Sequence, residues 1–172
     1  MTIWTIGHSI RPIEEFINAL TVHGIKVLAD VRRFPASRRY PHFNQQQLAA
    51  SLAAAGIEYL SFPELGGRRP PRPDSPNIAW RNKSFRGYAD YMETDSFRAG
   101  VERLLQAAKA QPVAIMCAEA VWWRCHRALI ADYFKATGFE VIHIMDANKS
   151  SPHPYTSAAR IIEGKLSYAG LV

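Results

Sequence analysis

The stretch PVAIMCAE, at residues 112–119, decides the fold that we expect for this chain. After its proline the stretch is apolar over residues 113–116, and it then reaches Cys117 and Glu119. A strand without polar alternation is typical of the centre of a parallel sheet whose two faces are both covered. We therefore expect a buried central strand over residues 112–116, followed by a polar loop.

Other apolar runs predict the rest of the sheet. Four more strands are expected at residues 2–6, 26–30, 57–61 and 141–145. Between them, apolar residues recur at helical spacing, and glycines such as Gly24, Gly56 and Gly138 end the periodic segments. Strands that alternate with helices predict an α/β fold: a three-layer sandwich with a mostly parallel, five-stranded, Rossmann-like sheet and helices on both faces.

Composition predicts a single α/β domain over residues 1–172, interrupted by a long loop rich in proline and arginine at residues 62–84. No apolar run approaches the roughly 18 residues that cross a bilayer, so we expect no membrane association. The start of the chain does not resemble a secretory signal. Since only two cysteines are present, we expect a reducing, cytoplasmic location. The oligomeric state is not indicated.

Positive charge is concentrated in one part of the chain. Residues 32–86 contain ten Lys or Arg against three Asp or Glu, a net charge of +7, whereas the rest of the chain sums to −1 and the whole chain to +6. Nine of the ten are arginines, whose planar fork suits phosphate and carboxylate groups. This pattern favours an anionic small molecule or nucleic acid as partner. The alternative is a solvated basic face that contributes only to solubility.

Polar residues follow the ends of several predicted strands. They are Gly7, His8 and Ser9; Asp30 and Arg32; Gly66, Gly67 and Arg68; Cys117 and Glu119; and, leading into a helix, Arg124, Cys125, His126 and Arg127. Ligands of open parallel sheets bind beyond the carboxyl ends of the strands. We therefore expect these residues to form one site.

Four of these residues are the predicted catalytic groups. Cys117 ends a buried strand before a helix, where arginines and the helix N-terminus lower a thiol's pKa, so we expect a nucleophile or redox thiol. His126 or His8 would transfer protons, and Glu119 would orient a histidine or act as a base. The simpler alternatives are a buried cysteine that packs as a small apolar group and a histidine satisfied within a turn. Of the two thiols, we expect Cys117 rather than Cys125 to react.

The remaining residues are predicted to bind substrate. Arg32, Arg68 and Arg127 would hold the anion, together with Gly7, Ser9, Asp30, Gly66, Gly67 and Arg124. Two alternatives stay open. Asp30 and Arg32 can form a structural ion pair, and the adjacent glycines can serve a tight turn.

Two kinds of chemistry fit the spacing less well. Six residues separate Cys117 from Arg124, whereas five separate the cysteine and arginine of cysteine phosphatases, and Glu119 would repel a phosphate. Zinc or iron has ligand types available in Cys117, Cys125, His126 and His8. The spacing of the two cysteines is not that of a zinc site, so no metal or other cofactor is predicted.

Several motifs together resemble those of one family. They are TIGHS at 5–9, DVR at 30–32, LGGR at 65–68, MCAE at 116–119 and RCHR at 124–127, with HPYT at 153–156 near the end. This set resembles the domain-of-unknown-function 488 family over nearly the whole chain. The resemblance implies an α/β fold and a site at the Cys-x-Glu and Cys-His-Arg elements. It implies neither a substrate nor a cofactor.

Three classes of function therefore stand in order. The first is an enzyme that acts on an anionic substrate, nucleotide- or nucleic-acid-derived, through the Cys, His, Glu and Arg residues named above. The second is a nucleic-acid-binding module without catalysis, in which the same arginines contact phosphates and tryptophans such as Trp122 and Trp123 stack on bases. The third is a metal-binding protein.

Overall fold

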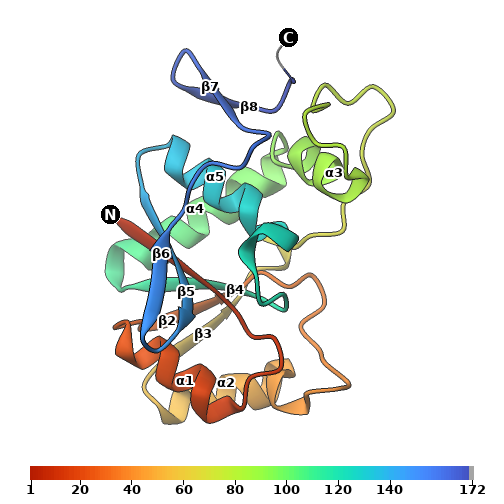
Figure 1. Cartoon of the computed structure of the whole chain (residues 1–172). Helices are drawn as coiled ribbons and strands as arrows, with labels where there is room; N and C mark the ends of the chain where they lie inside the picture. Colours follow the sequence, from red (N-terminus) through yellow and green to blue (C-terminus); the bar gives the residue numbers. More distant parts are fainter. Residues whose placement is uncertain (171–172) are drawn as a thin grey trace.

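Strand β4 (Val113–Cys117), the apolar stretch that decides the fold, lies inside a six-stranded sheet of order β3-β2-β4-β1-β5-β6 (Figure 1). The computed structural model describes residues 1–170. Strands β1 to β5 are mutually parallel, and β6 runs antiparallel to β5. The other strands are β1 (Thr2–Gly7), β2 (Val27–Asp30), β3 (Glu58–Ser61), β5 (Glu140–Asp146) and β6 (Lys149–Pro152). The predicted α/β class is confirmed.

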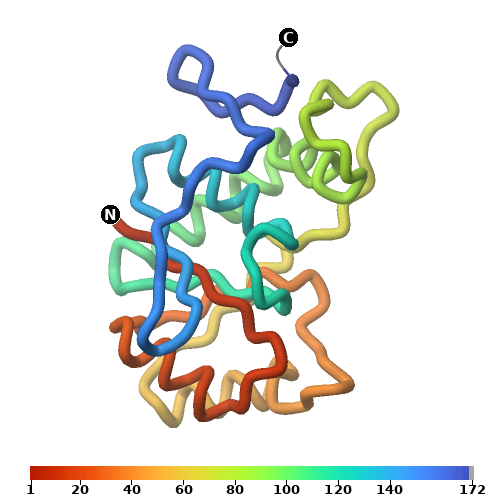
Figure 2. The backbone as a smooth tube through the Cα atoms, in the orientation of Figure 1, coloured from red at the N-terminus to blue at the C-terminus, as the bar shows by residue number. Residues whose placement is uncertain are grey.

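Helices cover both faces of this sheet (Figures 1 and 2). One face carries α1 (Ile13–Val22) and α2 (Gln45–Ala54), and the other carries α3 (Lys83–Tyr91), α4 (Asp95–Ala110) and α5 (Arg127–Ala136). Short 3₁₀ helices occupy Pro41–Phe43, Pro63–Leu65 and Trp122–Arg124, and a separate hairpin joins β7 (Arg160–Ile162) to β8 (Lys165–Ser167). Within residues 1–170, no helix has the length and apolar character needed to cross a membrane.

The sixth strand was not predicted, and its sequence explains why. Residues 149–152 read KSSP, which is mostly exposed and carries no apolar pattern. The segment follows β5 through a tight turn in which the backbone N–H of Asn148 donates to Asp146. A short polar strand at the edge of a sheet is held by backbone pairing rather than by burial of side chains.

The pleat of β4 decides which helices Cys117 faces. Side chains alternate between the two faces of a strand. Ile115 and Cys117 accordingly belong to the apolar cluster beneath α3, α4 and α5, whereas Ala114 and Met116 belong to the cluster beneath α1 and α2. Cys117 is therefore directed toward the start of α5.

The long proline- and arginine-rich loop is ordered around one buried carboxylate. Asp90 in α3 accepts hydrogen bonds from the Arg72 backbone N–H at 2.8 Å, the Ser75 hydroxyl at 2.5 Å and the Asn77 amide at 2.7 Å. Burial acts to raise the pKa of Asp90, but these hydrogen bonds outweigh it and lower the pKa below its usual value. The loop is thereby held against α3.

Candidate functional site

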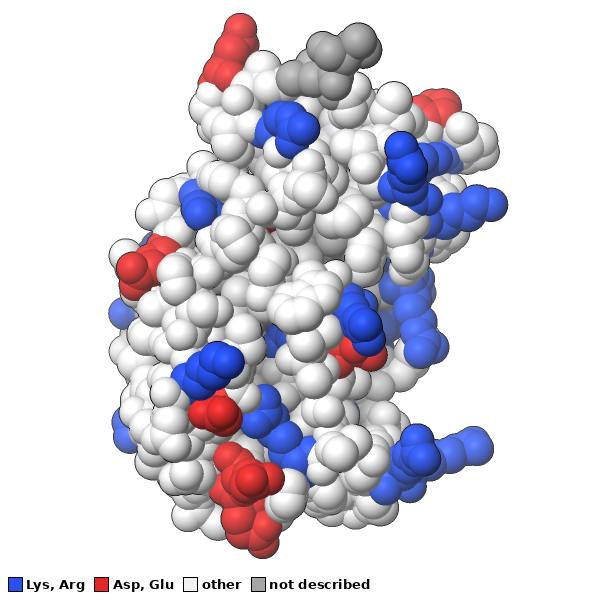
Figure 3. Space-filling model, in the orientation of Figure 1, with Lys and Arg blue, Asp and Glu red and all other residues white. Residues whose placement is uncertain are grey.

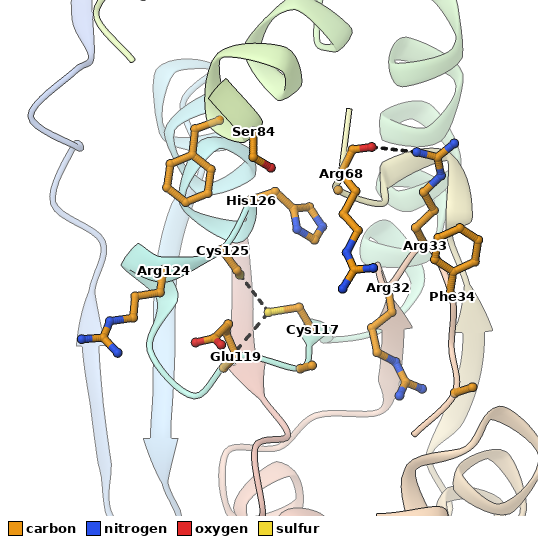
Figure 4. A pocket seen from close by; sticks show the side chains of 14 residues that line it. Arg32, Arg33, Phe34, Arg68, Ser84, Cys117, Glu119, Arg124, Cys125 and His126 are labelled. Atoms are coloured by element: carbon orange, nitrogen blue, oxygen red, sulfur yellow. Dashed lines mark hydrogen bonds between the residues drawn. The ribbon is translucent and has the colours of Figure 1, made fainter. Parts of the chain in front are cut away.

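A cavity of about 520 Å³ opens at the carboxyl edge of the parallel strands, on the face covered by α5 (Figure 4). Ligand sites usually have a volume of this order. Its lining comes from the end of β4, from the connections that follow β2, β3 and β4, and from the first turn of α3. The lining residues are Arg32, Arg33, Phe34, Ala36, Gly67, Arg68, Ser84, Phe85, Cys117, Ala118, Glu119, Arg124, Cys125 and His126.

Two thiols meet at this cavity. The Sγ atoms of Cys117 and Cys125 lie 2.8 Å apart, and both cysteines are free and buried. Cys117 ends β4, and Cys125 lies two residues before α5, so a strand and a helix fix the two ends of their connection. The backbone N–H of Arg127 donates to the Cys125 sulfur at 3.3 Å.

Arg127 lies beside the thiols with its charge uncompensated by a carboxylate. Its side chain is 2% exposed, and one terminal nitrogen donates to the backbone oxygens of Glu119 at 3.1 Å and Ala120 at 3.4 Å. Within residues 1–170, its Nε has no hydrogen-bond partner and no carboxylate forms an ion pair with it. A buried cation without a carboxylate partner favours the ionised form of a neighbouring acid such as the Cys117 thiol.

The thiols consequently have unequal acidities. Burial acts to raise the pKa of Cys117, but the hydrogen bond from Cys125, the charge of Arg127 and the backbone of Glu119 together lower it to about 7. Burial raises the pKa of Cys125 well above its usual value, and both the hydrogen bond to Cys117 and the negative charge of an ionised Cys117 raise it further. The surroundings of the two thiols thus favour the thiolate form at Cys117 over Cys125, and the reactivity of Cys117 stays a prediction.

His126 contributes a neutral imidazole to the cavity wall. Its Nε2 lies 3.1 Å from the carbonyl oxygen of Val31, which only accepts hydrogen bonds, so Nε2 carries the proton and Nδ1 is the acceptor. Burial lowers its pKa to about 4. Nδ1 lies against Gly67, where a Cβ atom would approach it to 2.8 Å. Gly67 is therefore needed for close packing against the ring.

Arginines surround the mouth of the cavity in different orientations. Arg68 is exposed, has a positive φ of 59°, and its backbone oxygen accepts a hydrogen bond from Arg33 at 2.8 Å. Figure 4 shows the Arg68 side chain extending toward the space beside Cys117, whereas Arg124 points away from it. Lysine and arginine side chains gather along the edge at the right of Figure 3, where the surface is hollowed.

A second polar cluster lies at the same edge of the sheet but on the α1–α2 face. Asp30 is fully buried and forms an ion pair with Arg32 at 2.8 Å, and it also accepts hydrogen bonds from the Arg32 backbone N–H and from the Tyr59 hydroxyl. Burial and the nearby Asp30 charge raise the pKa of Tyr59 well above its usual value, which keeps its hydroxyl a donor. The structure thus contains the Asp30–Arg32 ion pair that the sequence allowed as an alternative.

His8 belongs to this second cluster. Its ring stacks on Phe43 with centroids 4.2 Å apart, and its Nδ1 lies 2.9 Å from the Ser9 carbonyl oxygen. Its Nε2 lies 3.5 Å from a terminal nitrogen of Arg32. Burial lowers the pKa of His8 to about 4. His8 does not line the cavity, so the interpretation as a histidine satisfied within a turn describes its surroundings better than a role in proton transfer.

The glycines and Ser9 serve the packing of strand ends. A Cβ atom on Gly7 would overlap the Glu119 carbonyl oxygen, and one on Gly66 would lie 2.7 Å from the Arg33 backbone. The backbone N–H of Ser9 donates to the Ala118 carbonyl. The positions of Gly7, Ser9 and Gly66 at strand ends, which suggested anion binding, are therefore explained by the close approach of backbone segments.

The predicted site residues thus separate into two groups. Those that line the cavity are Cys117, Glu119, His126, Arg32, Gly67, Arg68, Arg124 and Cys125. Those that do not are His8, Gly7, Ser9, Asp30, Gly66 and Arg127. Arg33, Phe34, Ala36, Ser84, Phe85 and Ala118 also line it and were missed. Arg33 and Phe34 directly follow Arg32, so extending the strand-end argument by two residues would have found them.

A buried polar chain that the sequence did not predict lies behind Trp122. Asp132 accepts from His153 Nε2 at 2.8 Å, His153 Nδ1 accepts from His143 Nε2 at 2.8 Å, and His143 Nδ1 accepts from the Thr5 hydroxyl at 2.6 Å. This order of donors follows because a carboxylate only accepts. Trp122 stacks on His143, with ring centroids 4.6 Å apart. The polar side-chain atoms of these four residues all have hydrogen-bond partners, which is typical of a structural network.

The four candidate metal ligands named from the sequence do not form one cluster within the described residues. In the described part of the chain, no group of three or more His, Cys, Asp or Glu side chains is arranged to hold a metal. Cys117 and Cys125 are in contact, but His8 lies on the opposite face of the sheet, and Nε2 of His126 is bonded to Val31.

These features define the chain as an α/β protein with a paired-cysteine, arginine-lined cavity at the carboxyl edge of its parallel strands. The model of the family described as Domain of unknown function DUF488 matches residues 12–134, and the chain belongs to this family. Comparisons with curated proteins and with solved structures find no match. The matched residues include both cysteines and every lining residue of the cavity.

Proposed function

We propose that this protein is an enzyme that acts on an anionic substrate, with Cys117 as the nucleophile or redox thiol. One observation carries the proposal: Cys117 lies at an arginine-lined cavity beside Arg127, whose buried charge has no carboxylate partner among the described residues. A thiolate stabilised in this way is nucleophilic at neutral pH. The arginines at the mouth attract an anionic reactant to it.

Each residue has a distinct role in this proposal. Arg127 holds the thiolate rather than the substrate, because its donors are directed at backbone oxygens and its charge acts on Cys117. Arg68 and Arg33 contact the anion, since Arg32 is committed to Asp30. His126 transfers protons through Nδ1, because its low pKa leaves it neutral and it lines the cavity.

Alkylation with two reagents of different charge tests the proposal. Rates of modification of each cysteine by iodoacetamide and by iodoacetate are measured at graded pH, with mass spectrometry of the separated peptides. Cys117 is expected to react with an apparent pKa of about 7. The ratio of its rate with anionic iodoacetate to its rate with iodoacetamide is also expected to be several-fold higher in the folded protein than in the urea-unfolded protein. If Cys117 reacts like a free thiol of pKa about 8.5, or shows no preference for iodoacetate, the proposal is wrong.

Nucleic-acid binding without catalysis is a second candidate, and one observation favours it. Phe34 is 65% exposed at the mouth of the cavity, next to Arg33 and near the exposed Arg38 and Arg39. Exposed aromatic rings among arginines are typical of surfaces that stack on bases. Titration with single-stranded and duplex nucleic acid at two salt concentrations tests it. Binding that weakens steeply with salt while Cys117 is unreactive supports it, and no binding at low salt contradicts it.

A further inference from the structure

We infer that Cys117 and Cys125 form a dithiol that exchanges with a carboxylate-bearing, low-molecular-weight disulfide bound in the arginine-lined cavity. The inference rests on the proposed function, because it uses Cys117 as the attacking thiol. It adds the chemical class of the reactant and a role for Cys125.

The first support is the geometry of the two sulfur atoms. At 2.8 Å the Sγ atoms are already closer than two sulfurs in ordinary contact. A disulfide bond of about 2.05 Å therefore requires an approach of less than about 1 Å. The end of β4 and the start of α5 hold the two thiols at this separation.

The second support is the asymmetry of the pair. Arg127 and Cys125 favour the thiolate of Cys117, whereas burial keeps Cys125 protonated. Exchange proceeds best when one thiol attacks as a thiolate and the second is held back to resolve the mixed disulfide. When Cys125 in turn loses its proton, the Arg127 backbone N–H that donates to its sulfur is in place to stabilise the charge.

The third support is the match between cavity and reactant. Both cysteines share the cavity with Arg33 and Arg68, which take no part in the ion pair with Asp30, and Figure 4 shows the Arg68 side chain extending toward the space beside Cys117. Forked guanidinium groups bind carboxylates in two-point contacts. Thiols that carry carboxylates, such as glutathione, are of a size that a cavity of about 520 Å³ admits in part.

The exchange balances in two steps. The Cys117 thiolate attacks one sulfur of the disulfide RSSR, its S–S bond breaks, and one RS⁻ leaves and takes a proton from solvent. Cys125 then releases its proton to solvent and attacks the Cys117 sulfur, which expels the second RS⁻. The dithiol has been oxidised by two electrons to an intramolecular disulfide, and RSSR has been reduced to two RSH. Excess thiol reverses both steps.

Intact-mass measurement on the reduced protein tests the inference without any variant. Reduced protein is mixed anaerobically at pH 7 with glutathione disulfide, quenched with acid and weighed. The expected product has lost two hydrogen atoms, and peptide mapping joins Cys117 to Cys125. A product that stops at one bound glutathione, or no product, overturns the inference.

Two matched cysteine variants separate the roles. Cys125→Ser is expected to accumulate the mixed disulfide on Cys117, and Cys117→Ser is expected to react at least tenfold more slowly. If Cys125→Ser forms no mixed disulfide while wild type is oxidised, or if both variants react alike, the assigned roles are wrong. If Cys117 is alkylated near neutral pH as the proposed function requires, but no intramolecular disulfide forms, this inference fails while the proposed function stands.

The charge of the reactant is tested with cystamine, a cationic disulfide. The measured quantity is the ratio of the reaction rate with glutathione disulfide to the rate with cystamine. This ratio is expected to be at least fivefold higher for the folded protein than for the urea-unfolded protein. High salt should reduce this preference, because the arginines are partly solvated. An equal or inverse preference contradicts the choice of an anionic reactant.

Discussion

Two buried polar clusters lie at the same edge of the sheet, on opposite faces, and they differ in how their charges are balanced. On the α1–α2 face, Asp30 and Arg32 satisfy each other, with Tyr59 as a further donor. On the α5 face, Arg127 has no carboxylate partner within residues 1–170, and Cys117 and Cys125 lie beside it. In the balanced cluster the buried charges compensate each other, whereas in the proposed site the uncompensated cation is available to stabilise a thiolate.

Breaking the balanced cluster should have the largest effect, and only on stability. Asp30→Asn leaves the buried Arg32 charge unpaired, so the free energy of unfolding should fall by about 3 kcal/mol. Urea denaturation measures this change, and alkylation of Cys117 should change less than about twofold. A loss of thiol reactivity in a folded Asp30→Asn protein would show that the two faces act as one site.

Both clusters contain a histidine that burial keeps neutral, and this shared feature predicts acid lability. The pKa of His8 and that of His126 are each lowered to about 4. Between pH 6.5 and pH 4 the unfolded state therefore binds more protons than the folded state, so stability rises with pH across this window. The expected contribution is on the order of 2 kcal/mol per histidine.

Urea denaturation at graded pH measures this dependence, with His8→Phe and His126→Phe as matched variants. Each variant should flatten the dependence between pH 4 and pH 6.5. A wild-type protein whose stability is constant or falls with rising pH in this window would contradict the burial of neutral imidazoles.

Removing the unbalanced cation should act on the thiol. In Arg127→Met the apparent pKa of Cys117 should rise from about 7 toward the value of about 8.5 of a free thiol, so alkylation at pH 6.5 slows on the order of tenfold. Arg127→Lys keeps the charge and should restore part of the rate. Tyr59→Phe is the control on the other face, because Tyr59 bonds Asp30 and does not line the cavity. An unchanged apparent pKa in folded Arg127→Met would assign the low pKa to another cause.

The outer arginines should have the smallest effect. Arg68→Ala should lower the ratio of iodoacetate to iodoacetamide rates about threefold, because one solvated charge near the cavity is lost. Arg124→Ala is the matched control, since Arg124 is exposed and points away from Cys117. Equal effects of the two substitutions would indicate general attraction by the basic surface instead of contact by Arg68.

The fold was predictable because it depends on apolar patterning. The five parallel strands and the helices between them follow from runs such as residues 112–116, and the missed strand β6 is a polar edge strand. The edge at which the site lies was also predictable. The prediction of a single site did not consider which face of the sheet each side chain occupies. The pleat places Cys117 with Ile115 on one face and Asp30 with Leu28 on the other.

The environment of the thiols could not be predicted from spacing. Arg124 and Arg127 are equivalent candidates in the sequence, but a 3₁₀ turn at Trp122–Arg124 exposes the first, and the start of α5 buries the second. The contact between Cys117 and Cys125 depends on the same turn, which brings residues eight apart together. Long-range contacts decide such details, and a single sequence does not encode them as a local pattern.

Direct titration of the thiolate tests the central claim most simply. The ultraviolet absorbance of the thiolate is followed with pH in wild type and in Cys117→Ser, and the difference between the two isolates Cys117. A midpoint near pH 7 is predicted, moved upward in Arg127→Met. A midpoint at or above about 8.5 in the folded wild-type protein would contradict a thiolate stabilised by Arg127.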